Sequence, residues 1–168
     1  MAVSAFGANR EPVMIDAGLY QLKQVDYSQR GEIIYVLVNG VAKPQTVIYS
    51  AEDCFGEKYY FTEEGLRYIK DSREERLEQR FVLHHLDRIP TILKSPIIVG
   101  KSGDNAQHHL YFKPIAIQES HYKKLLFVVV LKKSTHNCVW NFYYAKSDKI
   151  SEATEVFFKT KEAKKYLR

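Results

Sequence analysis

The sequence lacks any apolar run of about twenty residues, the length that a helix needs to cross a bilayer. The longest apolar stretch, residues 125–131, has only the length of a strand. The N-terminus also lacks a basic segment followed by an apolar one, so no secretory signal is visible. We therefore expect a cytoplasmic protein that does not enter the membrane.

Cysteine is scarce, because Cys54 and Cys138 are the only two. They are far apart and match no metal-ligand spacing, which predicts two reduced thiols. Two adjacent histidine pairs occur at residues 84–85 and 108–109. Neighbours point about 100° apart on a helix and to opposite faces on a strand, so neither pair can chelate one ion by itself. The sequence therefore predicts neither a metal site nor another cofactor.

Two motifs of common enzyme classes are also missing. Residues 100–102 (GKS) resemble the end of a phosphate-binding loop, but Ser95 occupies the position of the upstream glycine. Gly103 and Asp104 follow at once and prevent a helix from starting there. No serine lies in a nucleophile elbow. Scattered His, Arg, Lys and Tyr residues remain, and they suit metal-free phosphodiester chemistry or binding.

The charge is divided unevenly along the 168 residues. The whole chain has a net charge of +5, but residues 1–80 sum to −3 and residues 81–168 sum to +8. A basic half with many tyrosines favours a polyanionic partner, RNA above all. Alternatively, the lysines protect strand edges and a C-terminal helix and serve solubility alone.

The first third of the chain predicts a flexible lead and a hairpin. Residues 1–12 are small and polar and predict a flexible lead. Residues 13–57 predict a β-hairpin extension, with strands at 32–38 and 46–49. Asn39 and Gly40 between them both accept positive φ, as a tight hairpin turn requires. Pro44 places the second strand at an edge.

Residues 58–168 predict the main α+β domain. Thr62 is a suitable N-cap for a helix, and apolar positions recur at three- and four-residue steps from Leu77 to Leu93. Pro90 should break this second helix. Strands are expected at 97–100, 110–117, 125–131 and 139–145, followed by a C-terminal helix at 152–167. These elements predict helices packed on one face of a four-stranded antiparallel sheet, in one compact domain overall.

The segments KYYFTEEGLRYI, RFVLHHLDRIPTILKSPIIVGKS, HHLYFKPIAI, KKLLFVVVLKK and CVWNFYYAKSD occur in this order. Over residues 59–149 the pattern resembles the phage-linked branch of the barnase–EndoU–colicin–RelE (BECR) nuclease superfamily. The resemblance implies a metal-independent ribonuclease or a toxin-like RNA-cleaving protein, with tRNA among its candidate substrates. In that chemistry the ribose 2′-hydroxyl attacks the adjacent phosphorus.

The resemblance also implies which residues form the site. Histidine would act as acid or base, and Arg and Lys would stabilise the charge on the phosphate. The implied site residues are Arg80, His84 or His85, Lys113, Asn141 and Tyr143. The residues themselves leave plainer interpretations open. His85 leans toward the apolar positions of its helix, and Lys113 suits an ordinary strand edge.

The chain departs from the family pattern at two places. Asp71-Ser72-Arg73 stand where the family has an Arg–His–Pro turn, and Asn141 replaces a threonine. An amide serves poorly as an acid or a base. The chain is therefore either a divergent active member that relies on His84 or His85, or a catalytically inactive interaction module. As a module it would be a phage or plasmid regulator or a partner-binding protein. In either case the candidate partners besides RNA are an antitoxin-like or a regulatory protein.

Overall fold

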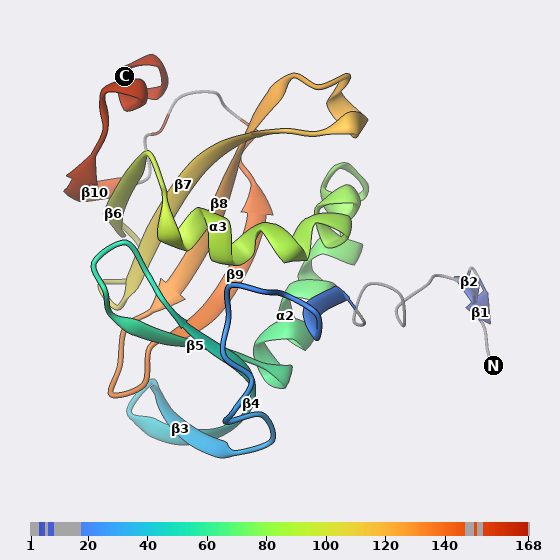
Figure 1. The fold of residues 1–168 in the computed structure, drawn as a ribbon, viewed down its shortest axis with the longest axis vertical. Coiled ribbons are helices and arrows are strands. Elements are labelled where there is room, and N and C mark those ends of the chain that lie inside the picture. Colours follow the sequence, from blue (N-terminus) through green and yellow to red (C-terminus); the bar gives the residue numbers. More distant parts are fainter. Residues whose placement is uncertain (1–3, 6, 9–17, 147–149, 151–152, 168) are drawn as a thin grey trace.

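The computed structural model describes residues 4–5, 7–8, 18–146, 150 and 153–167. Within these residues the main element is one mixed sheet of eight strands in the order β10-β6-β7-β8-β9-β5-β4-β3 (Figure 1). Its strands are β3 (Ile33–Val38), β4 (Val41–Glu52), β5 (Lys58–Thr62), β6 (Ile98–Ser102), β7 (His108–Ala116), β8 (Lys124–Lys132), β9 (Cys138–Tyr144) and β10 (Ala153–Lys159). The short strands β1 (Ser4–Ala5) and β2 (Gly7–Ala8) form a separate antiparallel pair.

The prediction of a four-stranded sheet with helices on one face is wrong. Strands β6 to β9 match the four expected strands and pair antiparallel in sequence order. The sheet continues past both of its expected edges, because β10 pairs with β6 and β5 pairs with β9. The β5–β9 pairing is parallel, whereas the other neighbours are antiparallel. Parallel neighbours need no turn between them, so local turn signals could not reveal this one.

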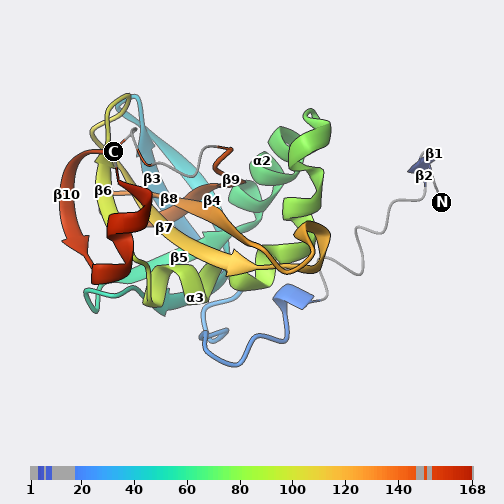
Figure 2. The same ribbon diagram turned by 90° about the horizontal axis from the view of Figure 1, so that it is seen from above.

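Both faces of the sheet are covered. Three helices pack on the first face: α2 (Glu63–Glu74), the 3-10 helix η1 (Leu77–Arg88) and α3 (Ile89–Lys94). Along β8, Phe127 and Val129 point to these helices, whereas Leu126 and Val128 point to the opposite face. That second face is covered by the 3-10 helix η3 (Lys161–Tyr166) and Ile150. Figure 2 shows β10 on one side of strands β6 to β8 and α2 on the other.

The predicted C-terminal helix is also wrong in the part of it that the structure describes. Residues 153–159 form β10 instead, and η3 follows. Val156, Phe157 and Phe158 favour a strand, and Phe158 packs against the helix-covered core while its backbone pairs with Val99 of β6. Ser151 as a candidate N-cap and the lysines near the C-terminus indicated a helix, but pairing with the edge of β6 outweighs those signals.

Several local predictions are confirmed. Asn39 and Gly40 have φ values of 52° and 80° and form the turn between β3 and β4. The Oγ1 of Thr62 caps α2 by accepting a hydrogen bond from the Gly65 N–H at 3.0 Å. Pro90, however, lies in the first turn of α3, and the predicted break is instead at His85, whose backbone is not helical (φ −123°, ψ 20°). The proposed flexible lead, residues 1–12, lies mostly outside the described residues.

Two close contacts hold β4, β5 and α2 in place. In the loop between β4 and β5, the buried Asp53 carboxylate accepts hydrogen bonds from the N–H groups of Phe55 and Glu57 at 2.9 and 3.0 Å. It also accepts one from the Tyr111 hydroxyl on β7 at 2.6 Å. On α2, Gly65 lies directly against the backbone of β9.

No helix among the described residues is long and apolar enough to span a bilayer.

Candidate functional site

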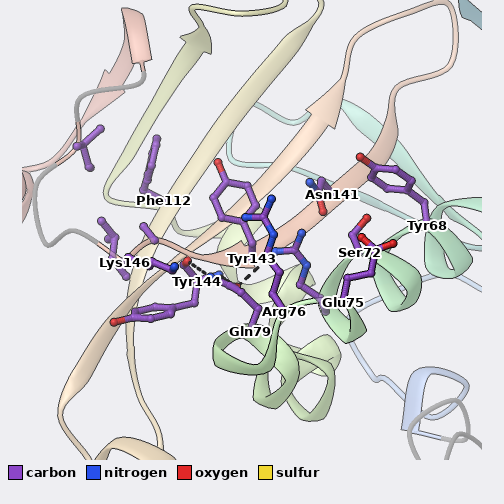
Figure 3. A pocket seen from close by; sticks show the side chains of 14 residues that line it. Tyr68, Ser72, Glu75, Arg76, Gln79, Phe112, Asn141, Tyr143, Tyr144 and Lys146 are labelled. Carbon is purple, nitrogen blue, oxygen red and sulfur yellow. Dashed lines mark hydrogen bonds between the residues drawn. The ribbon is translucent and has the colours of Figure 1, made fainter.

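A groove of about 590 Å³ lies between the C-terminal part of α2 and the end of β9 (Figure 3). One wall comes from α2 and the turn after it, with Tyr68, Ser72 and Arg76. The facing wall comes from β9, with Asn141 and Tyr143. The groove extends over the second face of the sheet toward Phe112, Leu126 and Ile150. One end is thus polar and basic, and the other is apolar.

The groove exists because β9 continues beyond its parallel neighbour. Within the described residues, β5 pairs with β9 at Tyr60 and Cys138, where β9 begins, so the end of β9 lies past the pairing. At that position the side chain of Gln79 makes the backbone hydrogen bonds that a neighbouring strand would otherwise make. Its Oε1 accepts from the Tyr144 N–H at 3.0 Å, and its Nε2 donates to the Tyr144 carbonyl at 2.8 Å. The side-chain amide is therefore fixed, and it is only 3% exposed.

Arg73 lines this groove and is 7% exposed. Its Nη1 donates to Oε1 of Gln79 at 3.4 Å, and its guanidinium carbon lies 5.7 Å from the centre of the Tyr143 ring. In the part of the chain that the structure describes, its Nε is buried without a hydrogen-bond partner and no carboxylate forms an ion pair with it. Burial, and secondly the nearby Arg76, lower the pKa of Arg73. The site thus holds a buried positive charge that no described carboxylate neutralises.

Two of the six predicted site residues lie in the groove. Tyr143 forms part of its wall, and Asn141 lines it while accepting a hydrogen bond from the Phe142 N–H at 2.8 Å. Arg80 lies elsewhere and donates from Nε to the carbonyl of Glu74 at 3.1 Å. Lys113 also lies elsewhere.

Lys113 and the two histidines have structural surroundings. The Nζ of Lys113 donates to the Ser95 carbonyl at 2.6 Å. The Nε2 of His85 lies 3.1 Å from Oε1 of Glu119, and its ring packs against Phe127, as expected for a histidine that leans toward apolar neighbours. His84 is exposed on η1. None of the residues that line the groove is a histidine.

The sequence interpretation missed Arg73, Arg76 and Gln79 as a group. Arg73 lies in the last turn of α2, whereas Arg76 lies in extended backbone after the helix, so helical spacing did not mark the pair. The segment from 71 to 79 is so highly charged that it indicated only a solvated helical face or a loop. The role of Gln79 depends on where β9 ends, and no local pattern encodes that.

The described residues do not offer a metal site or a reactive thiol. They contain no cluster of three or more His, Cys, Asp or Glu side chains that could hold a metal ion. Both cysteines are free. Burial raises the pKa of Cys54 to about 11 and that of Cys138 to about 12. Both thiols are therefore protonated at neutral pH, the form in which they are poor nucleophiles.

His108 gives the fold a testable pH dependence. It lies beside Trp140, and its Nε2 is buried without a hydrogen-bond partner among the described residues. Burial, with Lys132 as a second cause, lowers its pKa from 6.5 to about 4. A depressed histidine pKa favours folding above about pH 6.5, and this contribution is lost as the pH falls from there toward 4.

We therefore expect His108→Gln to lose less stability than the parent protein between about pH 7.5 and about pH 5. Urea unfolding at both pH values measures the difference. The same loss in both proteins would show that protonation of His108 is not coupled to folding.

Comparisons of the chain with protein-family models, with curated proteins and with solved structures find no significant match. The resemblance to the BECR nuclease superfamily stays a prediction.

Proposed function

We propose that the protein binds single-stranded RNA in the groove between α2 and β9. The observation that supports this most directly is the meeting of two arginines, Arg73 and Arg76, with two tyrosines, Tyr68 and Tyr143, in one groove. Guanidinium groups bind phosphate oxygens in a bidentate geometry. Unpaired bases stack on tyrosine rings, and single strands expose those bases.

Ion pairs within the basic half favour this groove as the RNA site over a diffuse attraction of RNA to all the positive charges of that half. Four lysines of that half are partly neutralised by glutamates, in the pairs Lys101–Glu155, Lys124–Glu162, Lys133–Glu57 and Lys146–Glu78. Among the described residues, Arg73 and Arg76 have no such pair. The remaining lysines would add long-range attraction for a polyanion in the cytoplasm, whereas the two arginines would supply the specific contacts.

Binding is better supported than cleavage. Cleavage through the 2′-hydroxyl needs an acid and a base beside the phosphate. His84 and His85, the residues expected to supply them, do not line the groove. Incubation of the bound RNA in EDTA is the direct test for metal-independent cleavage, and newly formed 3′ ends would restore the ribonuclease hypothesis.

A partner-binding module is the second candidate function. The edge strand β3 exposes Ile33, Tyr35 and Leu37 on one face, at 52%, 57% and 45%. Such an apolar face is typical of protein contacts rather than of RNA contacts. Tyr35→Ser should therefore leave RNA binding unchanged if the groove is the RNA site.

Arg76→Ala is expected to weaken binding of single-stranded RNA about tenfold or more, the scale of a lost charge-assisted hydrogen bond. Arg88→Ala is the matched control, because it removes the same charge from an exposed residue of η1 that lies outside the groove. Fluorescence polarisation at two salt concentrations measures both variants, and parent affinity should fall with salt. Equal losses in both variants would contradict the groove as the site.

A further inference from the structure

Arg73 carries a buried positive charge. Charged side chains are rarely buried unless they are paired. Arg73 is nine-tenths buried, yet its contacts in the described part of the chain are one amide oxygen and one aromatic ring. Neither of these neutralises a full positive charge. Within the described residues, no side chain supplies the missing negative charge.

The surroundings of Arg73 hold it in one place. Gln79 is fixed by its two hydrogen bonds to the backbone of Tyr144, and its Oε1 also accepts from Arg73. The ring of Tyr143 lies next to the guanidinium. A cation held in this way loses little freedom when an anion binds, which favours affinity.

Further groups around the groove suit an anion with several oxygen atoms. Arg76 adds a second positive charge, and the Ser72 hydroxyl and the Asn141 amide lie on facing walls (Figure 3). Glu75 also lines the groove, but it forms no ion pair with either arginine within the described residues. The positive charges are therefore available to a ligand, and Glu75 would oppose it.

We propose that Arg73 and Arg76 form a preorganised site for one phosphate group. The inference rests on the proposed function, in which this phosphate belongs to the backbone of single-stranded RNA. Arg73 is the anchor, because it is buried and fixed, and Arg76 completes the charge balance from the rim. Gln79 acts as a positioning residue through Arg73.

The buried charge of Arg73 should also affect the stability of the protein without a bound anion. If Arg73 waits for an external anion, its buried charge destabilises the protein when no anion is present. Arg73→Met, which has a similar length and no charge, should then raise the melting temperature in phosphate-free buffer. If Arg73 served only the fold, through Gln79 and Tyr143, the same substitution would lower it.

Thermal unfolding of the full chain, with millimolar inorganic phosphate or with chloride at equal ionic strength, tests the site. Phosphate should raise the melting temperature of the parent protein by about 2–4 °C. Arg73→Met should melt higher than the parent in chloride and gain nothing from phosphate. Arg73→Lys keeps the charge but loses the planar fork and should gain less than the parent. Arg88→Ala is the control and should respond as the parent does.

Each other outcome has a defined meaning. A lower melting temperature for Arg73→Met in chloride, or an equal gain from phosphate in Arg73→Met and the parent, would overturn the inference. No gain in the parent would overturn it too, and RNA binding retained at that point would leave the proposed function standing on other contacts. Phosphate that stabilises the parent but does not displace labelled RNA would overturn the assignment of the phosphate to the RNA backbone. If phosphate stabilises the parent protein but the parent does not bind RNA, the proposed function is wrong and the groove is a site for free phosphate.

Discussion

Asp53→Ala is expected to destabilise the protein by about 3–5 kcal/mol. The carboxylate is fully buried and accepts three hydrogen bonds, from two backbone N–H groups and the Tyr111 hydroxyl. Alanine would leave all three donors without a partner in a dry environment. Each buried unsatisfied donor costs about 1–3 kcal/mol. Urea unfolding at neutral pH measures the change.

Two further variants make the Asp53 prediction specific. Tyr111→Phe removes one of the three donors and should cost about a third to a half as much. Asp104→Ala is the control, because Asp104 is exposed in the turn after β6, and its loss should change stability by about 0.5 kcal/mol or less. An Asp53→Ala protein as stable as Asp104→Ala would show that this network contributes little.

Gly65→Ala is expected to destabilise the protein by about 1–3 kcal/mol, although alanine is the better helix former by about 1 kcal/mol. A β-carbon at this position would lie 2.8 Å from the carbonyl oxygen of Val139 and 3.1 Å from Oγ1 of Thr62. Because the first of these is backbone of β9, α2 would have to move away from the sheet. Gly65→Val should cost more than Gly65→Ala.

Gly18→Ala provides the matched control for Gly65. A β-carbon at Gly18 would meet nothing within 4 Å, and its backbone is helical. The control should therefore melt at or slightly above the parent temperature, whereas Gly65→Ala should melt several degrees below it. Equal melting temperatures for the two variants would mean that α2 can shift on β9 at no cost.

The parts of the fold that local chemistry determines could be predicted from the sequence. The Thr62 hydroxyl can cap the start of a helix. Asn39 and Gly40 adopt the positive φ values of a tight hairpin turn, which most other residues disfavour. The four strands β6 to β9 are joined by short loops, so their order in space follows their order in sequence. The outer strands could not be placed in this way. β10 depends on the free edge of β6, and β5 depends on a partner far along the chain.

The candidate site was predictable only in part, for a related reason. Asn141 and Tyr143 were named because they lie on a recognisable strand. Arg73 stands out because it is buried with no counter-ion among the described residues, and burial of a charged helix end is invisible in a sequence. His85 shows the converse, because the family resemblance suggested catalysis, whereas its ring packs against Phe127 and its Nε2 pairs with Glu119.

The parallel pairing of β5 with β9 also leads us to expect a particular order of assembly. Strands β6 to β9 close short loops as they pair, whereas joining Tyr60 to Cys138 closes a long one, and long loops are slower to close. We expect strands β6 to β9 to pair first, and β5 with α2 to dock on them last. During synthesis the order of appearance is the reverse, since β5 and α2 emerge first and their partner β9 emerges near the end. A nascent chain therefore holds its groove arginines long before it has a groove.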